Sequence, residues 1–253
     1  MLKWIPVAAA MLMALMTVAT PASVSAMTVQ PVVVDLKPAG RGVSATVTVQ
    51  NSFTTPLPVE LTVQALDFDE NGVVQTGKDT GDLLVFPPQA LIQPGQTQAF
   101  RIQWVGDPTL DKSHHYYVTV AQLPVQLPEG QSAIQILYNF QVLVNVAASS
   151  GGPRIDIASA IIGKNDKGQP VPQIVVRNQG NSYGYLSRTR IHIVYKDATG
   201  KQTFNKVMTP EEIQQEVGFG LIGPNVTRKV LLPVVLPGAD GQVSVELLDA
   251  KAR

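Results

Sequence analysis

The sequence predicts an all-β protein built from two β-sandwich domains in tandem. Apolar and polar residues alternate with period two over many short segments, which is typical of half-buried strands. Clusters of glycine, proline and asparagine separate these segments at regular intervals. Residues 146–153 are small and end in Gly-Gly-Pro, so they predict a linker between two halves, each long enough to form a domain.

The N-terminus has the features of a secretion signal. Lys3 supplies a positive charge, residues 8–18 form an apolar run, and small residues end at Ala26. The run is short for a membrane span, which needs about 20 residues. We therefore expect residues 1–26 to be cleaved and the chain to be exported and soluble. A first domain is predicted over residues 27–147 and a second over 153–253.

The composition excludes several classes of function. The chain has no cysteine, so disulfides and thiol chemistry are absent. Lys plus Arg number 19 and Asp plus Glu also number 19, which gives no electrostatic basis for binding nucleic acid or an anionic membrane. Only 15% of residues are charged whereas 45% are apolar, and this balance favours an apolar surface kept for a partner.

The first half of the chain reads as a series of strands. Residues 28–36 are β-branched and apolar but contain Pro31, which predicts an edge strand or a strand that switches sheets. Further strands are predicted at residues 43–49, 59–65, 83–86, 97–104 and 115–123. With the stretch 133–146 they make about seven short antiparallel strands, the pattern of an immunoglobulin-like sandwich.

The second half has the same character. Strands are predicted at residues 154–162, 171–177, 185–196, 203–207, 227–235 and 242–248. Residues 210–216 alone have a helical composition, and they are enough for two turns at most. The second domain is therefore predicted to be a looser β-sandwich.

The stretch 133–146 is unusual because its apolar face is so long. Its even positions are all apolar: Ile134, Ile136, Tyr138, Phe140, Val142, Val144 and Val146. Successive strand residues point to opposite faces, so these side chains would form one face roughly 46 Å long. A domain of ordinary thickness cannot cover such a face. Either this is a long core strand with a bend, or part of it serves another protein.

Two motifs resemble ligand-binding loops but lack essential parts. Residues 67–72 resemble the start of a calcium loop, but Lys78 stands where the twelfth position requires a carboxylate. Residues 218–223 match a dinucleotide-binding glycine pattern, but Pro224 and a predicted strand follow, where that motif requires a helix. We predict a hairpin turn and a plain loop.

The histidines do not form a metal or catalytic site. His114 and His115 are neighbours on a predicted strand and should point to opposite faces, while His192 is far away in sequence. No serine stands in the strand–turn–helix context of a nucleophile. We predict that the protein is not an enzyme and binds no metal or cofactor.

Three segments resemble periplasmic pilus chaperones of the PapD type. In residues 87–102 a strand ended by proline turns through Pro-Gly into a strand ending in Arg-Ile. Residues 115–124 are similar to the next strand of that family, with its closing proline, and the long alternating strand follows in the expected place. In the second half, residues 176–181 resemble the family's strand-to-turn asparagine. The segments occur in the same order as in that family, and the resemblance covers essentially the whole mature chain.

This resemblance implies a periplasmic chaperone of the chaperone–usher pathway. Such a chaperone holds pilus or fimbrial subunits by donor-strand complementation and delivers them to an outer-membrane usher. The subunit lacks its last strand, and strand 133–146 would fill the open groove. The resemblance assigns Ile134, Ile136, Tyr138 and Phe140 to the subunit groove. Val142 and the residues after it would pack into the chaperone's own core.

One departure from the family concerns the anchor for the subunit's terminal carboxylate. The well-studied members of the family use an arginine on the first strand and a lysine late on the long strand, but in this sequence Val33 and Leu143 align with these places. This favours a divergent branch, such as the archaic chaperones of spore-coat-type pili. An anchor would have to come from Arg101, Arg188 or Arg190, and a structural role for Arg101 stays open.

A second hypothesis comes from another class of protein. An exported chain of two β-sandwiches could also serve as a structural or adhesive surface protein. An adhesin is expected to stay on the cell, whereas a chaperone is released with the periplasmic fraction.

Overall fold

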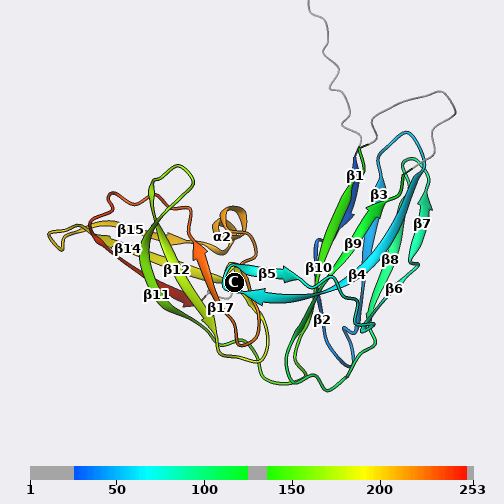
Figure 1. The fold of residues 1–253 in the computed structure, drawn as a ribbon, viewed down its shortest axis with the longest axis horizontal. Coiled ribbons are helices and arrows are strands. Elements are labelled where there is room, and N and C mark those ends of the chain that lie inside the picture. The colour runs from blue at the N-terminus through cyan, green and yellow to red at the C-terminus, as the bar shows by residue number, and fades with distance from the viewer. Residues whose placement is uncertain (1–25, 125–135, 250–253) are drawn as a thin grey trace, which may run out of the picture.

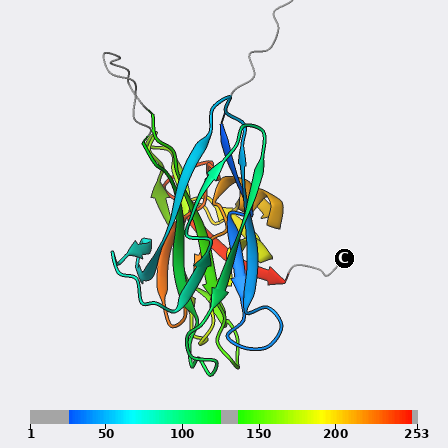
Figure 2. The same ribbon diagram turned by 90° about the vertical axis from the view of Figure 1, so that its right-hand side faces the viewer.

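The structure is a computed structural model that describes residues 26–124 and 136–249. Two β-domains lie side by side at an angle and are connected by a loop at one end (Figure 1). Turned by 90°, the strands of the first domain run lengthwise in front of the second domain (Figure 2). Each domain has its own hydrophobic core, so the predicted pair of tandem β-sandwiches is confirmed. The exact boundaries 27–147 and 153–253 stay a prediction.

The first domain is a sandwich of two sheets. One sheet has the order β1(Met27–Gln30), β3(Ser44–Asn51), β8(Thr97–Trp104) and β6(Leu83–Phe86). The other has the order β2(Val33–Leu36), β10(Asn139–Val146), β9(His114–Gln122), β4(Leu57–Asp69) and β5(Gly72–Gln75), with β7(Gln89–Ile92) paired to β4. The inner faces interdigitate in a core that includes Phe100, Val118 and Val144, all fully buried.

The first segment of the domain switches between the two sheets. Pro31 separates β1, which pairs antiparallel with β3, from β2, which pairs with β10. The expectation of a sheet-switching strand is confirmed. The β2–β10 pair is parallel, however, so the prediction of antiparallel strands throughout is wrong. The chain crosses from one sheet to the other without reversing, so β2 enters the second sheet in the direction of β10.

The second domain is built from smaller sheets. Its strands form a sheet β11(Ile155–Lys164), β12(Pro170–Asn178), β17(Thr227–Leu231), a sheet β15(Gln202–Met208), β14(Thr189–Lys196), β18(Gln242–Asp249), and a pair β13(Gly184–Tyr185), β16(Leu221–Ile222). The predicted short helix is α2(Pro210–Glu216), which begins with a capping box between Thr209 and Glu212.

The predicted strand 185–196 is interrupted. A 3-10 turn, η1(Leu186–Arg188), separates β13 from β14. Tyr185 and Leu186, on either side of the junction between β13 and η1, are both buried. The turn ends at Arg188, which is exposed at the surface facing the first domain.

Candidate functional site

Strand β10 is shorter than predicted. It begins at Asn139 and not at residue 133, while residues 125–135, and Ile134 with them, lie outside the described residues. Beyond Asn139, one backbone hydrogen bond continues the pairing, from Gln122 N to Tyr138 O at 2.9 Å. The described residues just before β10, 136–138, lie outside the paired strands because β9 ends at Gln122 and β2 pairs with β10 only from Leu143 onward.

One edge of β10 is half open. β10 pairs with β9 along its whole length, but with β2 only from Leu143 to Val146. Successive residues of a strand direct their backbone groups alternately to the two neighbouring strands. Leu143 N donates to Val32 O at 3.0 Å, so the odd-numbered residues face the β2 side. The backbone groups of Asn139 and Gln141 therefore point to an edge that no strand of the described chain occupies.

The apolar face of β10 continues from the core into solvent. Val142 and Val144 are fully buried, Phe140 is half-buried at the edge of the core, and Tyr138 is 36% exposed. Ile136, in the same alternation, is 69% exposed. Exposed apolar side chains next to unpaired backbone groups are the combination that β-strand addition requires.

The opposite face of β10 meets the second domain. Val33 and Leu143 lie directly opposite each other in the β2–β10 pair. The resemblance to PapD-type chaperones predicts that they occupy the anchor positions. Both pack in an apolar cluster at the seam between the domains, together with Phe68, Val73, Ala147, Tyr183, Tyr185, Phe219 and Leu221. The two predicted anchor positions are thus part of an apolar interdomain contact.

A charged group beside this cluster comes from the second domain. Arg188 donates from Nη2 to Asp35 Oδ2 at 2.7 Å, and its guanidinium lies 4.6 Å from the centre of the Tyr185 ring. Tyr185 Oη donates to Asp35 Oδ1 at 2.6 Å, and burial, followed by this contact with Asp35, raises the Tyr185 pKa. Asp35 therefore connects β2 to two residues of the second domain.

The hydrogen-bonded network continues into the first domain. Asn145 Nδ2 donates to Tyr185 Oη at 2.6 Å, and Asn145 Oδ1 lies 2.6 Å from His115 Nδ1. Since this amide oxygen can only accept, His115 Nδ1 carries the hydrogen, and His115 Nε2 accepts from Ser113 Oγ at 3.1 Å. Burial lowers the pKa of His115 to about 4, so the imidazole is neutral at pH 7.

Arg188 also lines a cavity of about 340 Å³ between the domains. Its walls include Pro31, Val32 and Val33 at the start of β2, with Phe219 from the second domain. This is the point at which the open edge of β10 ends, because β2 occupies the edge from Val33 onward. The cavity therefore lies beside the residues of β2 at which the open edge ends.

The other two candidate anchors lie elsewhere. Arg101 is exposed on β8, in the other sheet of the first domain, and donates to Ser44 Oγ at 3.1 Å. Arg190 is on β14, opposite Leu248 of β18. Of the three candidates, only Arg188 lines the cavity at Val33.

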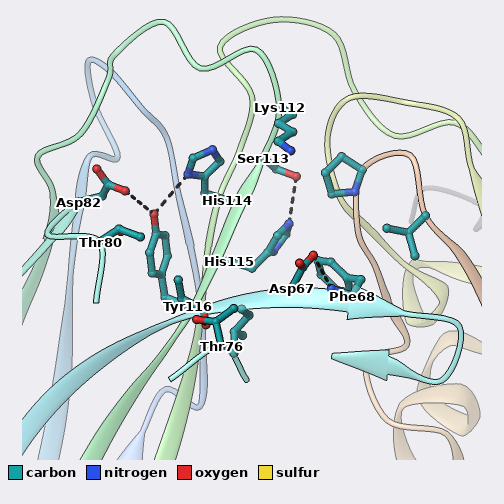
Figure 3. Close-up of a pocket in the computed structure, with 14 residues that line it drawn as sticks. Asp67, Phe68, Thr76, Thr80, Asp82, Lys112, Ser113, His114, His115 and Tyr116 are labelled. Atoms are coloured by element: carbon teal, nitrogen blue, oxygen red, sulfur yellow. Dashed lines mark hydrogen bonds between the residues drawn. The ribbon is translucent and has the colours of Figure 1, made fainter. Parts of the chain in front are cut away.

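His114 and His115 lie in different surroundings, as Figure 3 shows. His114 Nδ1 lies 3.3 Å from Tyr116 Oη, which donates to Asp82 Oδ2 at 3.0 Å, whereas His115 belongs to the interdomain network. Within residues 26–124 and 136–249, no cluster of three or more His, Asp or Glu side chains could hold a metal ion. No helix of this part of the chain is long and apolar enough to cross a membrane.

The fold defines a class of protein, the tandem two-domain β-sandwich, and in this chain the edge of one strand, β10, is half open. Residues 26–145 match the family model described as pili and flagellar-assembly chaperone, PapD N-terminal domain. This match covers most of the first domain, and the predicted resemblance to PapD-like chaperones is confirmed. Comparison with curated protein sequences gives no match.

Solved structures show a similar overall fold. A chain from a study of a chaperone–tip adhesin complex in CFA/I fimbriae biogenesis is 16% identical, with a TM-score of 0.51 over 89% of this chain and 100% of that one. The YadV chaperone is 14% identical, with a TM-score of 0.50 over 87% and 91%. A chain of the archaic CsuC–CsuE complex of Acinetobacter baumannii is 12% identical, with a TM-score of 0.48 over 82% and 91%. Such likeness does not assign a branch, so the archaic branch stays a prediction.

Proposed function

We propose that this protein is a non-enzymatic periplasmic chaperone that holds pilus subunits by donor-strand complementation and delivers them to an outer-membrane usher. The half-open edge of β10 carries the proposal, because unpaired backbone groups at Asn139 and Gln141 lie beside an exposed apolar face. The family match of the first domain supports the same role. The alternative, a structural or adhesive surface protein, does not require an open strand beside a cleft.

The subunit would complete its own sandwich with this strand. Its open sheet edge would pair with Asn139 and Gln141, while Ile136, Tyr138 and Phe140 fill its groove, with Ile134 before them in the sequence. Burial of one large apolar side chain is worth roughly 1.5–3 kcal/mol. Several such side chains are enough to decide whether a subunit stays bound.

Arg188 is the anchor that the geometry favours for the subunit's terminal carboxylate. A strand added along the open edge must end near Val33, where β2 takes over, and Arg188 lines the cavity at that point. A guanidinium carries five N–H donors, and Asp35 engages one of the Arg188 nitrogens. A second carboxylate can therefore bind the Arg188 guanidinium, and this pairing offsets the cost of burying the carboxylate's charge.

The open edge can be tested with proline. The N–H of Gln141 faces the open edge, so Gln141→Pro removes no ladder hydrogen bond within the chaperone but blocks pairing with a partner. We expect the variant to fold and to capture no subunit when co-expressed with each exported β-rich protein encoded nearby and purified by affinity pull-down. Val142→Pro is the control, since its N–H faces β9 and its loss should lower the melting temperature. Normal capture by Gln141→Pro would contradict strand addition at this edge.

A second experiment tests the anchor. Arg188→Ala should lower subunit recovery while leaving the melting temperature of the free protein almost unchanged, because exposed ion pairs contribute only about 0.2–1 kcal/mol. Arg101→Ala is the matched control and should leave both measurements unchanged. If Arg101→Ala lowers recovery and Arg188→Ala does not, the anchor has been assigned to the wrong arginine.

Cell fractionation separates the two functions. A chaperone is expected in the periplasmic fraction, free or with a subunit. Retention of the protein on the outside of the cell, with no bound subunit, would favour the surface-protein hypothesis.

A further inference from the structure

The longest strand of the first domain extends past its own sheet toward the second domain. β4 has 13 residues, and its pairing with β9 ends at Ala65, opposite Tyr116. From Leu66 to Asp69 it pairs only with β5, as a two-stranded hairpin. Figure 1 shows this β4–β5 hairpin crossing the space between the domains. An isolated two-stranded hairpin is marginally stable by itself, so its contacts with the second domain matter.

Phe68, on β4, packs in the apolar cluster between the two domains. Its ring lies edge-on to His115, with centroids 4.8 Å apart. On the other side it covers Gly223 so closely that a methyl group at Gly223 would overlap the ring. Phe68 therefore fills the space between a buried residue of the first domain and the backbone of the second.

The tip of the hairpin binds the edge of a sheet in the second domain. β17 is the last strand of its sheet, and Lys229 N on this strand donates to Glu70 O at 2.6 Å. Lys229 Nζ also lies 2.8 Å from Glu70 Oε2. The neighbouring Arg228 guanidinium packs over Gly72, whose φ of +139° is a conformation suited to glycine.

The contacts of the linker connect the two domains at one end, where the chain passes from one domain to the other and which would act as the hinge. Asn181 Nδ2 donates to Ser150 O at 2.8 Å and to Asp111 O at 2.9 Å, which fixes the linker against both domains. A contact at a hinge resists rotation weakly, whereas a contact away from the hinge resists it strongly. Relative motion is the usual behaviour of domains joined by a short linker unless an interface prevents it.

We propose that the β4–β5 hairpin is a brace that fixes the angle between the domains, with Phe68 and Gly223 as positioning residues. Through this angle the brace holds Arg188 opposite the end of the open β10 edge, a step that rests on the proposed function. The brace itself concerns the free protein and is measured without any subunit.

The absence of cysteine makes a direct measurement possible. Gln50→Cys and Thr203→Cys place one spin label on an exposed position of each domain, and the distance between the labels reports the interdomain angle. We expect one narrow distance distribution for the otherwise unchanged protein. Gly223→Ala should shift and broaden it, because the added methyl group displaces Phe68.

The chain offers a matched control for this substitution. Gly152→Ala adds the same methyl group in the linker, where it meets no atom within 4 Å, so the distribution should stay narrow. Phe68→Ala removes the brace contact without adding volume and should also broaden the distribution, whereas Phe68→Leu should largely preserve it. Distributions for Gly223→Ala and Phe68→Ala that match that of Gly152→Ala would overturn the brace.

Subunit capture by the same variants tests the positioning step. Gly223→Ala should capture less subunit than Gly152→Ala in the co-expression experiment. A changed interdomain distance with undiminished capture would overturn the positioning of Arg188 by the brace. If the unsubstituted protein captures no subunit, the proposed function fails, while the distance measurement still decides the brace.

Discussion

Ile136→Asp is expected to abolish subunit capture while leaving the free chaperone folded. Ile136 is 69% exposed, and substitutions at such positions usually change the free energy of unfolding by less than about 1 kcal/mol. In the complex the same position would lie in the subunit's apolar groove, where an unpaired carboxylate costs several kcal/mol. Pull-down after co-expression measures capture, and the subunit should be lost to aggregation or proteolysis.

Val144→Asp is the control on the same face of the same strand. Val144 is fully buried in the first core, so a charge there should unfold the chaperone itself. Thermal or urea unfolding of the two purified variants compares them directly. Equal destabilisation by both substitutions would show that the whole face is ordinary core, and donor-strand complementation would lose its support.

The strands were predictable wherever burial follows a strict local alternation. β8 has the predicted bounds, because Phe100 and Ile102 alternate with polar residues and Pro94-Gly95 provides the preceding turn. β6 and α2 also have the predicted bounds, because Pro87 follows the end of β6 and Pro210 begins α2. The four-residue strands β5 and β7 were missed, because four residues are too few to show a period.

The start of β10 could not be predicted from its own residues. The apolar alternation continues to Ile134, but a strand also needs neighbours, and the ends of β9 and β2 set the length of the ladder. The sequence shows which side chains share a face. Which of them have a partner within the chain is a property of the assembled sheet.

The interdomain hydrogen-bond network was also missed, because it joins residues far apart in the chain. Tyr185 and Asp35 are 150 positions apart, and Asn145 and His115 are 30 apart. Two local signals were present in the sequence. Asp35 is a charge within an apolar strand, and Asn145 stands between Val144 and Val146. A polar residue in such a context predicts a buried hydrogen-bond partner without identifying it.

The interdomain network should make the protein sensitive to acid through His115. Burial lowers the pKa of His115 in the folded state to about 4, below the ordinary value of 6.5. Above pH 6.5 the imidazole is neutral in both states, so the folded protein has its full stability. As the pH falls from 6.5 toward 4 the unfolded chain binds the proton first, and the free energy of unfolding should drop by up to roughly 3 kcal/mol.

His115→Gln separates this effect from the protonation of carboxylates in the same pH range. Glutamine keeps an N–H donor for Asn145, but it replaces a buried ring, so the variant should be less stable at neutral pH. Because glutamine does not titrate, the variant should lose less stability on acidification. Urea unfolding between about pH 7 and pH 4 gives the slope of the free energy of unfolding against pH for the variant and for the unsubstituted protein. Because His115 contacts Phe68 and Tyr183 as well as Asn145, its protonation places a charge at the domain seam. Parallel slopes for the variant and the unsubstituted protein would show that His115 does not titrate in this range.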